Sequence, residues 1–395
     1  MTLICAGTAV IDGRLCRPGW LETSGARIVA CGQGVPARPS DVEFADAVMV
    51  PGFVDMHVHG GGGASYADGI PADIVRAAAF HVRHGTTTTL ASLVTASPAD
   101  LLTAVGALAV VAEAPSLAGI HLEGPWLSAE RCGAHDRRQL RDPDPAEIDA
   151  VLAAAAGAVR MVTLAPELHG AIDAVRRLVD ADVVVALGHT DATYHRTRQA
   201  ISAGARVGTH LFNGMPPMHH REPGPALALL EDPRATVELI ADGVHLHPAL
   251  VRWVIDAAGP DRVALITDAT AAAGSAAGSF RLGGLDVEVV AGVPRVRGTS
   301  TIAGSTATMD QLFRNVMKRA GPSVDDALAA AVQMTSTTPA RALGLEHVGT
   351  LGVGFDADLV VLDARLQVTH VMSKGVWQPT APAPKNGAAA PPPVR

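Results

Sequence analysis

The run VMVPGFVDMHVH, residues 48–59, decides the fold of this chain. Side chains alternate between the two faces of an extended strand, so His57 and His59 leave it on the same side. Four glycines at positions 60–63 follow and open the strand into a loop. Two imidazoles at this spacing suit a divalent metal. Two hydrogen-bonded histidines beside a turn would give the same pattern, so both readings stay open for this run alone.

Beyond this run, apolar stretches of strand length alternate with Ala-rich stretches of helical length as far as about residue 340. Strands that read as continuous apolar runs are typical of a parallel sheet covered on both faces. Eight such units predict an α/β protein with a (β/α)8 TIM-type barrel. An open doubly wound sheet is the alternative, but no Gly-rich nucleotide loop opens the first helix.

The predicted strands are Val48–Met56, Thr86–Leu93, Ala118–Leu122, Arg160–Leu164, Val183–Leu187, Arg206–Thr209, Thr236–Ile240 and Val263–Ile266. The predicted helices between them include Ile70–Arg83, Ala99–Val111, Ile148–Ala156, Ala171–Val179, Thr193–Ala203 and Pro248–Ala257. After the eighth strand we expect a hairpin within residues 282–296 and helices over 309–319 and 324–334.

The two ends of the chain both read as β structure. Short strands separated by turns such as Asp12-Gly13 fill residues 1–50, and β patterns return at Asp358–Leu362 and Gln367–Val376. We therefore expect a small β-sandwich module built from residues 1–50 and 345–378, with the barrel over residues 51–344. Residues 379–395, rich in Pro and Ala, are expected to be a disordered tail.

Composition excludes several classes of protein. The 395 residues are 48% hydrophobic and 18% charged, which supports a large core. The net charge of -8 argues against a nucleic-acid partner. No apolar run reaches membrane-spanning length. The four cysteines form no CxxC motif or metal-ligand spacing, so we expect reduced thiols in a cytoplasmic protein.

Polar residues follow five of the predicted strands, at the barrel rim where such enzymes place their chemistry. Glu123, His189 and His210 offer one carboxylate and two imidazoles, which suits Zn²⁺ with an open position for water. His57 and His59 could hold a second ion that Glu123 bridges. Zinc makes the water it binds acidic enough to ionise near neutral pH.

The last strand ends in Asp268, which the ligand set does not require. It is therefore the candidate general base for the attacking water and the acid for the leaving group. Asp55, behind the first histidine pair, is expected to orient one of the histidines. His247 is expected to be structural.

Several segments together resemble the amidohydrolase superfamily, and within it the N-acetylglucosamine-6-phosphate deacetylase family. They are Pro51–Gly60, His121–Trp126, Gly188–Thr190, Thr209–Met215, Arg221–Gly224, Asp242–His245, Thr267–Ala269 and Ala303–Ser305. Many amidohydrolases bridge two metals with a carbamylated lysine on the fourth strand. Here no lysine precedes Lys318, which leaves the subtype with a glutamate after the third strand.

The resemblance implies hydrolysis of N-acetyl-D-glucosamine 6-phosphate to glucosamine 6-phosphate and acetate, with one or two divalent ions, of which Zn²⁺ is expected. It implies that Asp268 is the base and acid and that His135 polarises the acetyl carbonyl. The substrate-binding residues that it implies are Ala134, His135, Asn213, Gly214, Arg221, His245, Ile302, Ala303 and Gly304. Arg221 and His245 match contacts to the sugar phosphate. One such contact comes from the neighbouring subunit in the family, so a homodimer is implied.

Two other classes remain open from the sequence. Another amidohydrolase could act on N-acetylgalactosamine 6-phosphate or an N-acyl amino acid, because inversion of one hydroxyl can be read by a single backbone contact. A non-catalytic protein that binds carbohydrate or metal could use the same scaffold, although Asp268 argues against it. A binding module has no need of a free base beside a filled metal site.

Overall fold

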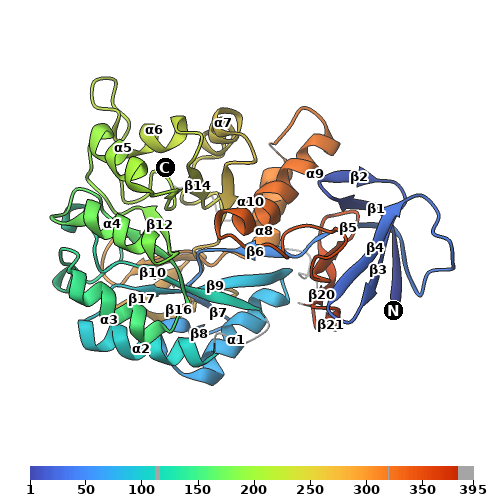
Figure 1. The fold of residues 1–395 in the computed structure, drawn as a ribbon, viewed down its shortest axis with the longest axis horizontal. Coiled ribbons are helices and arrows are strands. Elements are labelled where there is room, and N and C mark those ends of the chain that lie inside the picture. Colours follow the sequence, from blue (N-terminus) through green and yellow to red (C-terminus); the bar gives the residue numbers. More distant parts are fainter. Residues whose placement is uncertain (112–115, 319, 381–395) are drawn as a thin grey trace.

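The computed structural model describes residues 1–111, 116–318 and 320–380. It shows two bodies, a large barrel and a smaller β module that holds the N-terminus (Figure 1). The predicted disordered tail lies outside the described residues from residue 381 on.

The barrel is a sheet of eight strands within the described residues, in the order β15-β14-β13-β12-β11-β10-β9-β6, with every pair parallel. The strands are β6 (Phe53–Asp55), β9 (Thr86–Val94), β10 (Leu117–Glu123), β11 (Val159–Leu164), β12 (Val184–Leu187), β13 (Val207–Gly208), β14 (Thr236–Leu239) and β15 (Val263–Leu265). The chain beyond β15 meets the chain beyond β6, where the Asp268 N–H donates to the His57 carbonyl at 2.9 Å. The His59 N–H donates to the Ala269 carbonyl at 2.7 Å. The predicted barrel is confirmed, and an open doubly wound sheet is excluded.

Helices surround the barrel (Figure 1). They are α1 (Pro71–Val82), α2 (Pro98–Val111), α3 (Pro145–Ala155), α4 (Ala171–Asp180), α5 (Tyr194–Ala203), α6 (Gly224–Glu231), α7 (Pro248–Ala258), α8 (Met309–Met317), α9 (Val324–Val332) and α10 (Thr338–Ala342). Local signals explain where several begin: the Asp144 carboxylate accepts the N–H groups of Ala146 and Glu147 at the start of α3, which has Pro145 in its first turn. The His247 ring accepts the Ala249 N–H at the start of α7, which confirms its structural role.

The β module joins the two ends of the chain, as predicted. Its strands are β1 (Thr2–Ile11), β2 (Arg14–Cys16), β3 (Gly19–Ser24), β4 (Arg27–Gln33), β5 (Val42–Pro51), β19 (Leu359–Leu362), β20 (Val368–Ser373) and β21 (Val376–Gln378). They form one hydrogen-bonded sheet, in which β19 from the C-terminal part pairs with β5 from the N-terminal part. The module has its own apolar core, which includes Ile4, Leu21 and Leu359.

One predicted strand is divided between the two bodies. Val48–Met56 was expected to be a single barrel strand, but β5 stays in the module as far as Pro51 and β6 enters the barrel at Phe53. Between them, the Gly52 N–H donates to the Asp358 carbonyl at 2.9 Å. A Cβ atom at position 52 would lie 2.1 Å from the Thr87 hydroxyl, so only glycine fits where the chain changes sheets.

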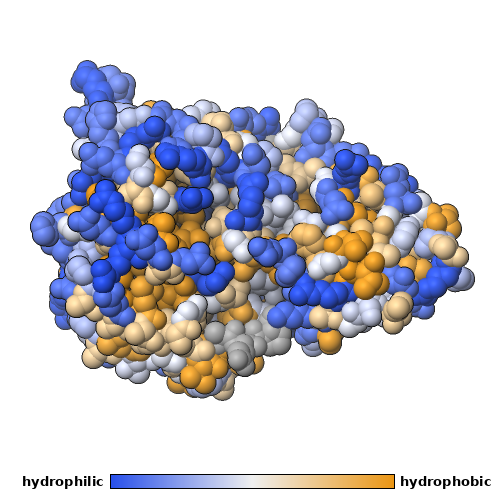
Figure 2. All heavy atoms as spheres, in the orientation of Figure 1, coloured by the Kyte–Doolittle hydropathy of each residue, from blue (hydrophilic) through white to orange (hydrophobic). Residues whose placement is uncertain are grey.

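The hairpin expected within residues 282–296 is larger than predicted. Three antiparallel strands, β16 (Gly278–Leu282), β17 (Leu285–Val290) and β18 (Val293–Val296), form a separate sheet between β15 and α8. Figure 2 shows hydrophilic side chains around most of the outline of the molecule and apolar side chains in smaller areas. Within the described part of the chain, no helix is both long enough and apolar enough to cross a membrane.

Candidate active site

Functional candidates gather at the mouth of the barrel because the backbone turns sharply where the strands end. His189, His210 and Asp268 have φ angles of 45°, 26° and 47°, in the left-handed region that side chains other than glycine rarely adopt. Such strain persists only where the surrounding structure enforces it, and it is concentrated at functional sites. The turns direct these side chains toward the barrel axis.

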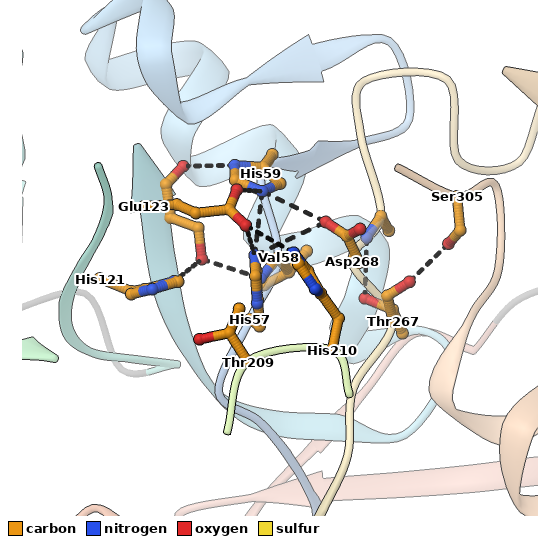
Figure 3. Close-up of polar contacts among 12 residues, drawn as sticks. His57, Val58, His59, His121, Glu123, Thr209, His210, Thr267, Asp268 and Ser305 are labelled. Atoms are coloured by element: carbon orange, nitrogen blue, oxygen red, sulfur yellow. Dashed lines mark hydrogen bonds and ion pairs between the residues drawn. The ribbon is translucent and has the colours of Figure 1, made fainter. Parts of the chain in front are cut away.

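Glu123, at the end of β10, lies at the centre of this cluster. Its Oε1 atom is 3.1 Å from His189 Nε2 and 2.9 Å from His210 Nε2. Its Oε2 atom is 3.2 Å from His59 Nε2, and His57 Nε2 is 3.5 Å from Oε1. Figure 3 shows His57, His59, Glu123, His210 and Asp268 converging from the end of β10 and from the segments that follow β6, β13 and β15. Two groups of three residues have metal-ligating geometry, and both contain Glu123. They are His57–His59–Glu123 and Glu123–His189–His210.

Backbone carbonyls set the tautomers of two of these histidines. His59 Nδ1 lies 3.2 Å from the Ser92 carbonyl, and His189 Nδ1 lies 2.8 Å from the Arg131 carbonyl. Because a carbonyl oxygen only accepts, each Nδ1 atom carries the proton. Each Nε2 atom then presents its lone pair to the cluster, as a metal ligand must.

The ring nitrogens face one another at short range. His57 Nε2 is 3.2 Å from His59 Nε2, and His189 Nε2 is 3.0 Å from His210 Nε2. Lone pairs at such distances repel unless a proton or a metal ion lies between them. All four rings are buried. The donor set therefore fits a divalent cation, and imidazole with carboxylate is the ligand chemistry of zinc-type sites.

The charges of the buried side chains also favour a positive charge at the site. Burial lowers the pKa of His57, but the carboxylates of Glu123 and Glu238 raise it more, and the pKa ends well above its usual value. The buried carboxylates thus demand a positive charge at this position, which a proton or a metal ion can supply.

Asp268 lies beside the two histidines that follow β6. Its Oδ1 atom is 3.2 Å from His59 Nε2 and 3.6 Å from His57 Nε2. Burial raises the pKa of the Asp268 carboxyl, but the neighbouring His59 and His57 lower it, and the net shift is downward. The carboxylate is therefore ionised and able to accept a proton. Gly304 packs closely against the Asp268 backbone, since a Cβ atom there would lie 2.6 Å from the Asp268 carbonyl oxygen.

His135 differs from His59 and His189 in its tautomer. Its Nδ1 atom accepts the Thr95 backbone N–H at 3.3 Å and lies 2.8 Å from the Thr95 hydroxyl. The proton of the neutral ring is therefore on Nε2, which lies 3.4 Å from Glu123 Oε2. Burial and the nearby His189 lower the pKa of His135 to about 4, so the ring is neutral at physiological pH. This histidine is a hydrogen-bond donor at the cluster.

A chamber of about 170 Å³ opens above the cluster. We keep the name chamber for this cavity throughout. The residues that line it are His59, Val94, Glu123, Gly133, Ala134, His135, His189, His210, Asn213, Gly214, His245, Asp268, Leu282, Ile302 and Gly304. Three of the residues expected at the site do not line it. His57 lies buried beneath it, Ala303 is buried between two lining residues, and Arg221 is exposed on the loop before α6.

His245 carries an acidic partner at the chamber wall. Its Nδ1 atom donates to Asp242 Oδ2 at 2.8 Å. Burial lowers the pKa of His245, but the Asp242 carboxylate raises it more, so the net shift is upward. The ring is a donor on its Nε2 side when protonated, which suits an anionic group of a ligand.

Asp55 does not have the contacts expected from the sequence. Its carboxylate accepts the Thr267 hydroxyl at 2.5 Å and the backbone N–H groups of Thr267 and His57, at 3.3 and 3.4 Å. It fixes the backbone where β6 meets the chain after β15 and does not reach an imidazole. The carboxylate that reaches the His57 Nδ1 atom is Glu238, which sequence reasoning missed. A glutamate inside the apolar run of β14 was the available signal, because unpaired carboxylates are rarely buried.

Comparison with known proteins agrees with this geometry. The model of the amidohydrolase family matches residues 48–378. An N-acetylgalactosamine-6-phosphate deacetylase of Escherichia coli O157:H7 is 38% identical over 371 residues, which cover 91% of this chain and 96% of that protein. The human N-acetylglucosamine-6-phosphate deacetylase is 37% identical over 351 residues, or 85% of this chain and 84% of that protein.

A solved structure is closer in sequence. It is a mutant N-acetyl-D-glucosamine-6-phosphate deacetylase from Mycobacterium smegmatis in complex with N-acetyl-D-glucosamine-6-phosphate, with 55% identity and a TM-score of 0.94. The similarity covers 95% of this chain and 98% of that chain. The family model matches most of the sequence, the relatives have the identities given above, and a His/Glu cluster lies at the barrel mouth. This chain therefore belongs to the amidohydrolase family.

Proposed function

We propose that this protein is a metal-dependent hydrolase that converts N-acetyl-D-glucosamine 6-phosphate to D-glucosamine 6-phosphate and acetate. The observation that carries the proposal is the pairing, at one chamber, of an ionised Asp268 with a neutral donor His135 on the shared Glu123 cluster. The relatives at 37% and 55% identity are named for this reaction.

Activation of the water and transfer of its proton are assigned to different groups of the chamber. A divalent cation held by Glu123, His189 and His210 would acidify water and polarise the acetamide carbonyl. The Asp268 carboxylate accepts the proton of the attacking water. It then delivers that proton to the nitrogen of the departing amine, so that one group is first the base and then the acid.

His135 stabilises the charge that develops on the acetyl oxygen. Its Nε2–H group is fixed by the Thr95 contacts before the substrate arrives, so no reorganisation is needed during the reaction. A donor placed in this way typically contributes about 3 kcal/mol to transition-state stabilisation. The low pKa of His135 prevents a second positive charge beside the cation.

The phosphate end of the substrate needs cationic donors. His245, supported by Asp242, is one candidate at the chamber wall. Arg221 has the bidentate guanidinium that suits a phosphate, but it does not line the chamber of its own chain. We propose that Arg221 enters the chamber of a second copy, so that the active unit is a homodimer.

Zinc is the ion that we propose, and it would be held by Glu123, His189 and His210 and, for a second ion, by His57, His59 and Glu123. Two imidazoles and a carboxylate with an open position are typical of catalytic zinc. We also place the enzyme in the cytoplasm, in agreement with four cysteines that are free thiols.

A second substrate is favoured by one comparison. The Escherichia coli relative named for N-acetylgalactosamine 6-phosphate is as similar as the human enzyme, at 38% against 37% identity. The 55% identity to the Mycobacterium smegmatis enzyme places the gluco epimer first.

Acetate release from a small panel of substrates tests the assignment. The panel contains N-acetylglucosamine and N-acetylgalactosamine, each with and without a 6-phosphate, and one N-acetyl amino acid. We expect the highest kcat/KM with N-acetylglucosamine 6-phosphate and a large loss without the phosphate. Equal rates on the phosphorylated and free sugars would contradict the proposal.

A further inference from the structure

Glu238, near the end of β14, is a buried carboxylate without a role in the chemistry described above. Its side chain is 0% exposed. Within the described residues, the ion pair that reaches it comes from His57 and not from an arginine or lysine. A buried carboxylate without a full positive charge nearby is costly, so its presence in the barrel needs a physical reason.

One oxygen of Glu238 contacts a residue of each candidate metal-binding group. Oε2 accepts the His57 Nδ1–H at 3.1 Å and the backbone N–H of His210 at 3.1 Å. His57 belongs to the group with His59 and Glu123, and His210 belongs to the group with Glu123 and His189. The other oxygen, Oε1, is buried without a hydrogen-bond partner among the described residues.

The contact with His57 fixes the ring. Because a carboxylate only accepts, His57 Nδ1 carries the proton and Nε2 presents its lone pair toward His59, at 3.2 Å. His59 and His189 are oriented by neutral backbone carbonyls. His57 thus differs from these two in being oriented by a full negative charge, which makes its Nε2 atom a stronger donor.

We propose that Glu238 is a positioning residue that orients His57 and strengthens the binding of a divalent cation to the His57–His59–Glu123 group. A cation bound by His57 would supply, through the ring, the positive charge that the buried carboxylate otherwise lacks. The Glu123–His189–His210 group depends on Glu238 only through the backbone of His210. This inference rests on the proposed function for the identity of the metal centre.

The experiment measures metal binding, without substrate, on the full chain. The protein is stripped with a chelator and titrated with Zn²⁺ by calorimetry against a competing chelator, and ions per chain are counted after dialysis. Wild type is compared with Glu238→Gln, His57→Ala and the double variant. Gln keeps an oxygen for both hydrogen bonds and removes the charge. Asp358→Asn, at another buried carboxyl remote from the cluster, is the matched control.

We expect two ions per wild-type chain, with the weaker of the two sites weakened most in His57→Ala. In Glu238→Gln that same site weakens about 10- to 100-fold, the usual effect of removing such a partner, while the tighter site is unchanged. The double variant should be no weaker than His57→Ala alone, since Glu238 acts through that ring. Asp358→Asn should bind as wild type does.

Three results would overturn the proposal: unchanged affinity in Glu238→Gln, additive losses in the double variant, or an equal loss at both sites. Thermal unfolding of each metal-free variant separates these results from a failure to fold. Deacetylase activity is not part of the measurement. A chain that binds ions as expected but does not release acetate would overturn the proposed function and leave the role of Glu238 intact.

Discussion

The Thr95 backbone N–H donates to His135 Nδ1 at 3.3 Å, and this contact makes His135 a donor on the side that faces Glu123. The Thr95 hydroxyl lies 2.8 Å from the same nitrogen and holds the ring in place. The nearby metal-type histidines have the opposite arrangement, since the Nδ1–H groups of His59 and His189 donate to carbonyls. Neighbouring imidazoles thus receive different functions from the backbone atoms behind them.

Replacing Thr95 by Val should lower kcat by about 10-fold with little change in KM, because the ring loses its side-chain support in the transition state. Thr95→Ser keeps the hydroxyl and should retain most of the activity. Steady-state kinetics of acetate release measure both variants. A kcat for Thr95→Val equal to that of wild type would show that the backbone N–H alone is sufficient.

Replacing Asp268 by Asn should remove the proton acceptor and nearly abolish turnover. Loss of a general base typically costs about 10²- to 10⁴-fold in rate. The metal content should be unchanged, because Glu123, His189 and His210 remain. Metal analysis beside acetate release makes the comparison. If Asp268→Asn loses its metal together with its activity, the aspartate is a ligand and the assignment as base is wrong.

Replacing Arg221 by Ala should raise KM for the phosphorylated sugar by about 10-fold or more, as expected when a charged hydrogen bond to phosphate is lost. Activity on the unphosphorylated sugar should change little. A panel of the two substrates measures this difference, and an equal effect on both would remove Arg221 from phosphate binding.

Mixing two impaired chains tests whether Arg221 serves the second subunit. A hybrid of Arg221→Ala and Asp268→Asn subunits, co-expressed with different tags, has one chamber with both an intact Asp268 and an Arg221 from the partner. We expect that chamber to recover wild-type KM, at about half the activity per dimer expected when one of two sites is intact. Hybrids that remain as weak as their parents would place Arg221 in its own chamber or outside the site.

Stability should depend on pH through Asp358. Burial, opposed by the hydrogen bond from the Lys374 N–H, raises the pKa of this carboxyl to about 6. Since the folded pKa exceeds the unfolded one, its contribution to stability is full below about pH 4 and is lost as the pH rises through 6. The loss amounts to about 3 kcal/mol. Asn does not titrate at this position. The Tm of Asp358→Asn minus that of wild type should therefore be larger at pH 7 than at pH 4.

Asp310 is the control of opposite sign. Burial raises the pKa of its carboxyl, but its contacts with His84 and Arg314 lower it more, and the net shift is downward. Its stabilisation is therefore present above the unfolded pKa and lost only in acid. Asp310→Asn should lower the Tm at pH 7, measured by the same thermal scans. A Tm gain for Asp358→Asn that is the same at both pH values would contradict the assignment of the titrating group.

The sequence alone determined the alternation of strands and helices, and with it the barrel. Periodicity reports which side of a segment is buried, and that property is local. Polar residues directly after apolar runs, such as Glu123, His189 and Asp268, were visible for the same reason. The end of a parallel strand has a known place in such a barrel.

Only the tertiary structure decided how these residues work. It divided Val48–Met56 between two sheets at Gly52, because a contact with Asp358 far along the chain holds the backbone there. It paired Glu238 with His57, 181 residues away, and gave Asp55 the Thr267 hydroxyl and two backbone N–H groups as partners. Such pairings follow from strand register and barrel closure, which join segments that no local pattern connects. The residue types came from the sequence, but the tautomers and partners that give each one its function came from the fold.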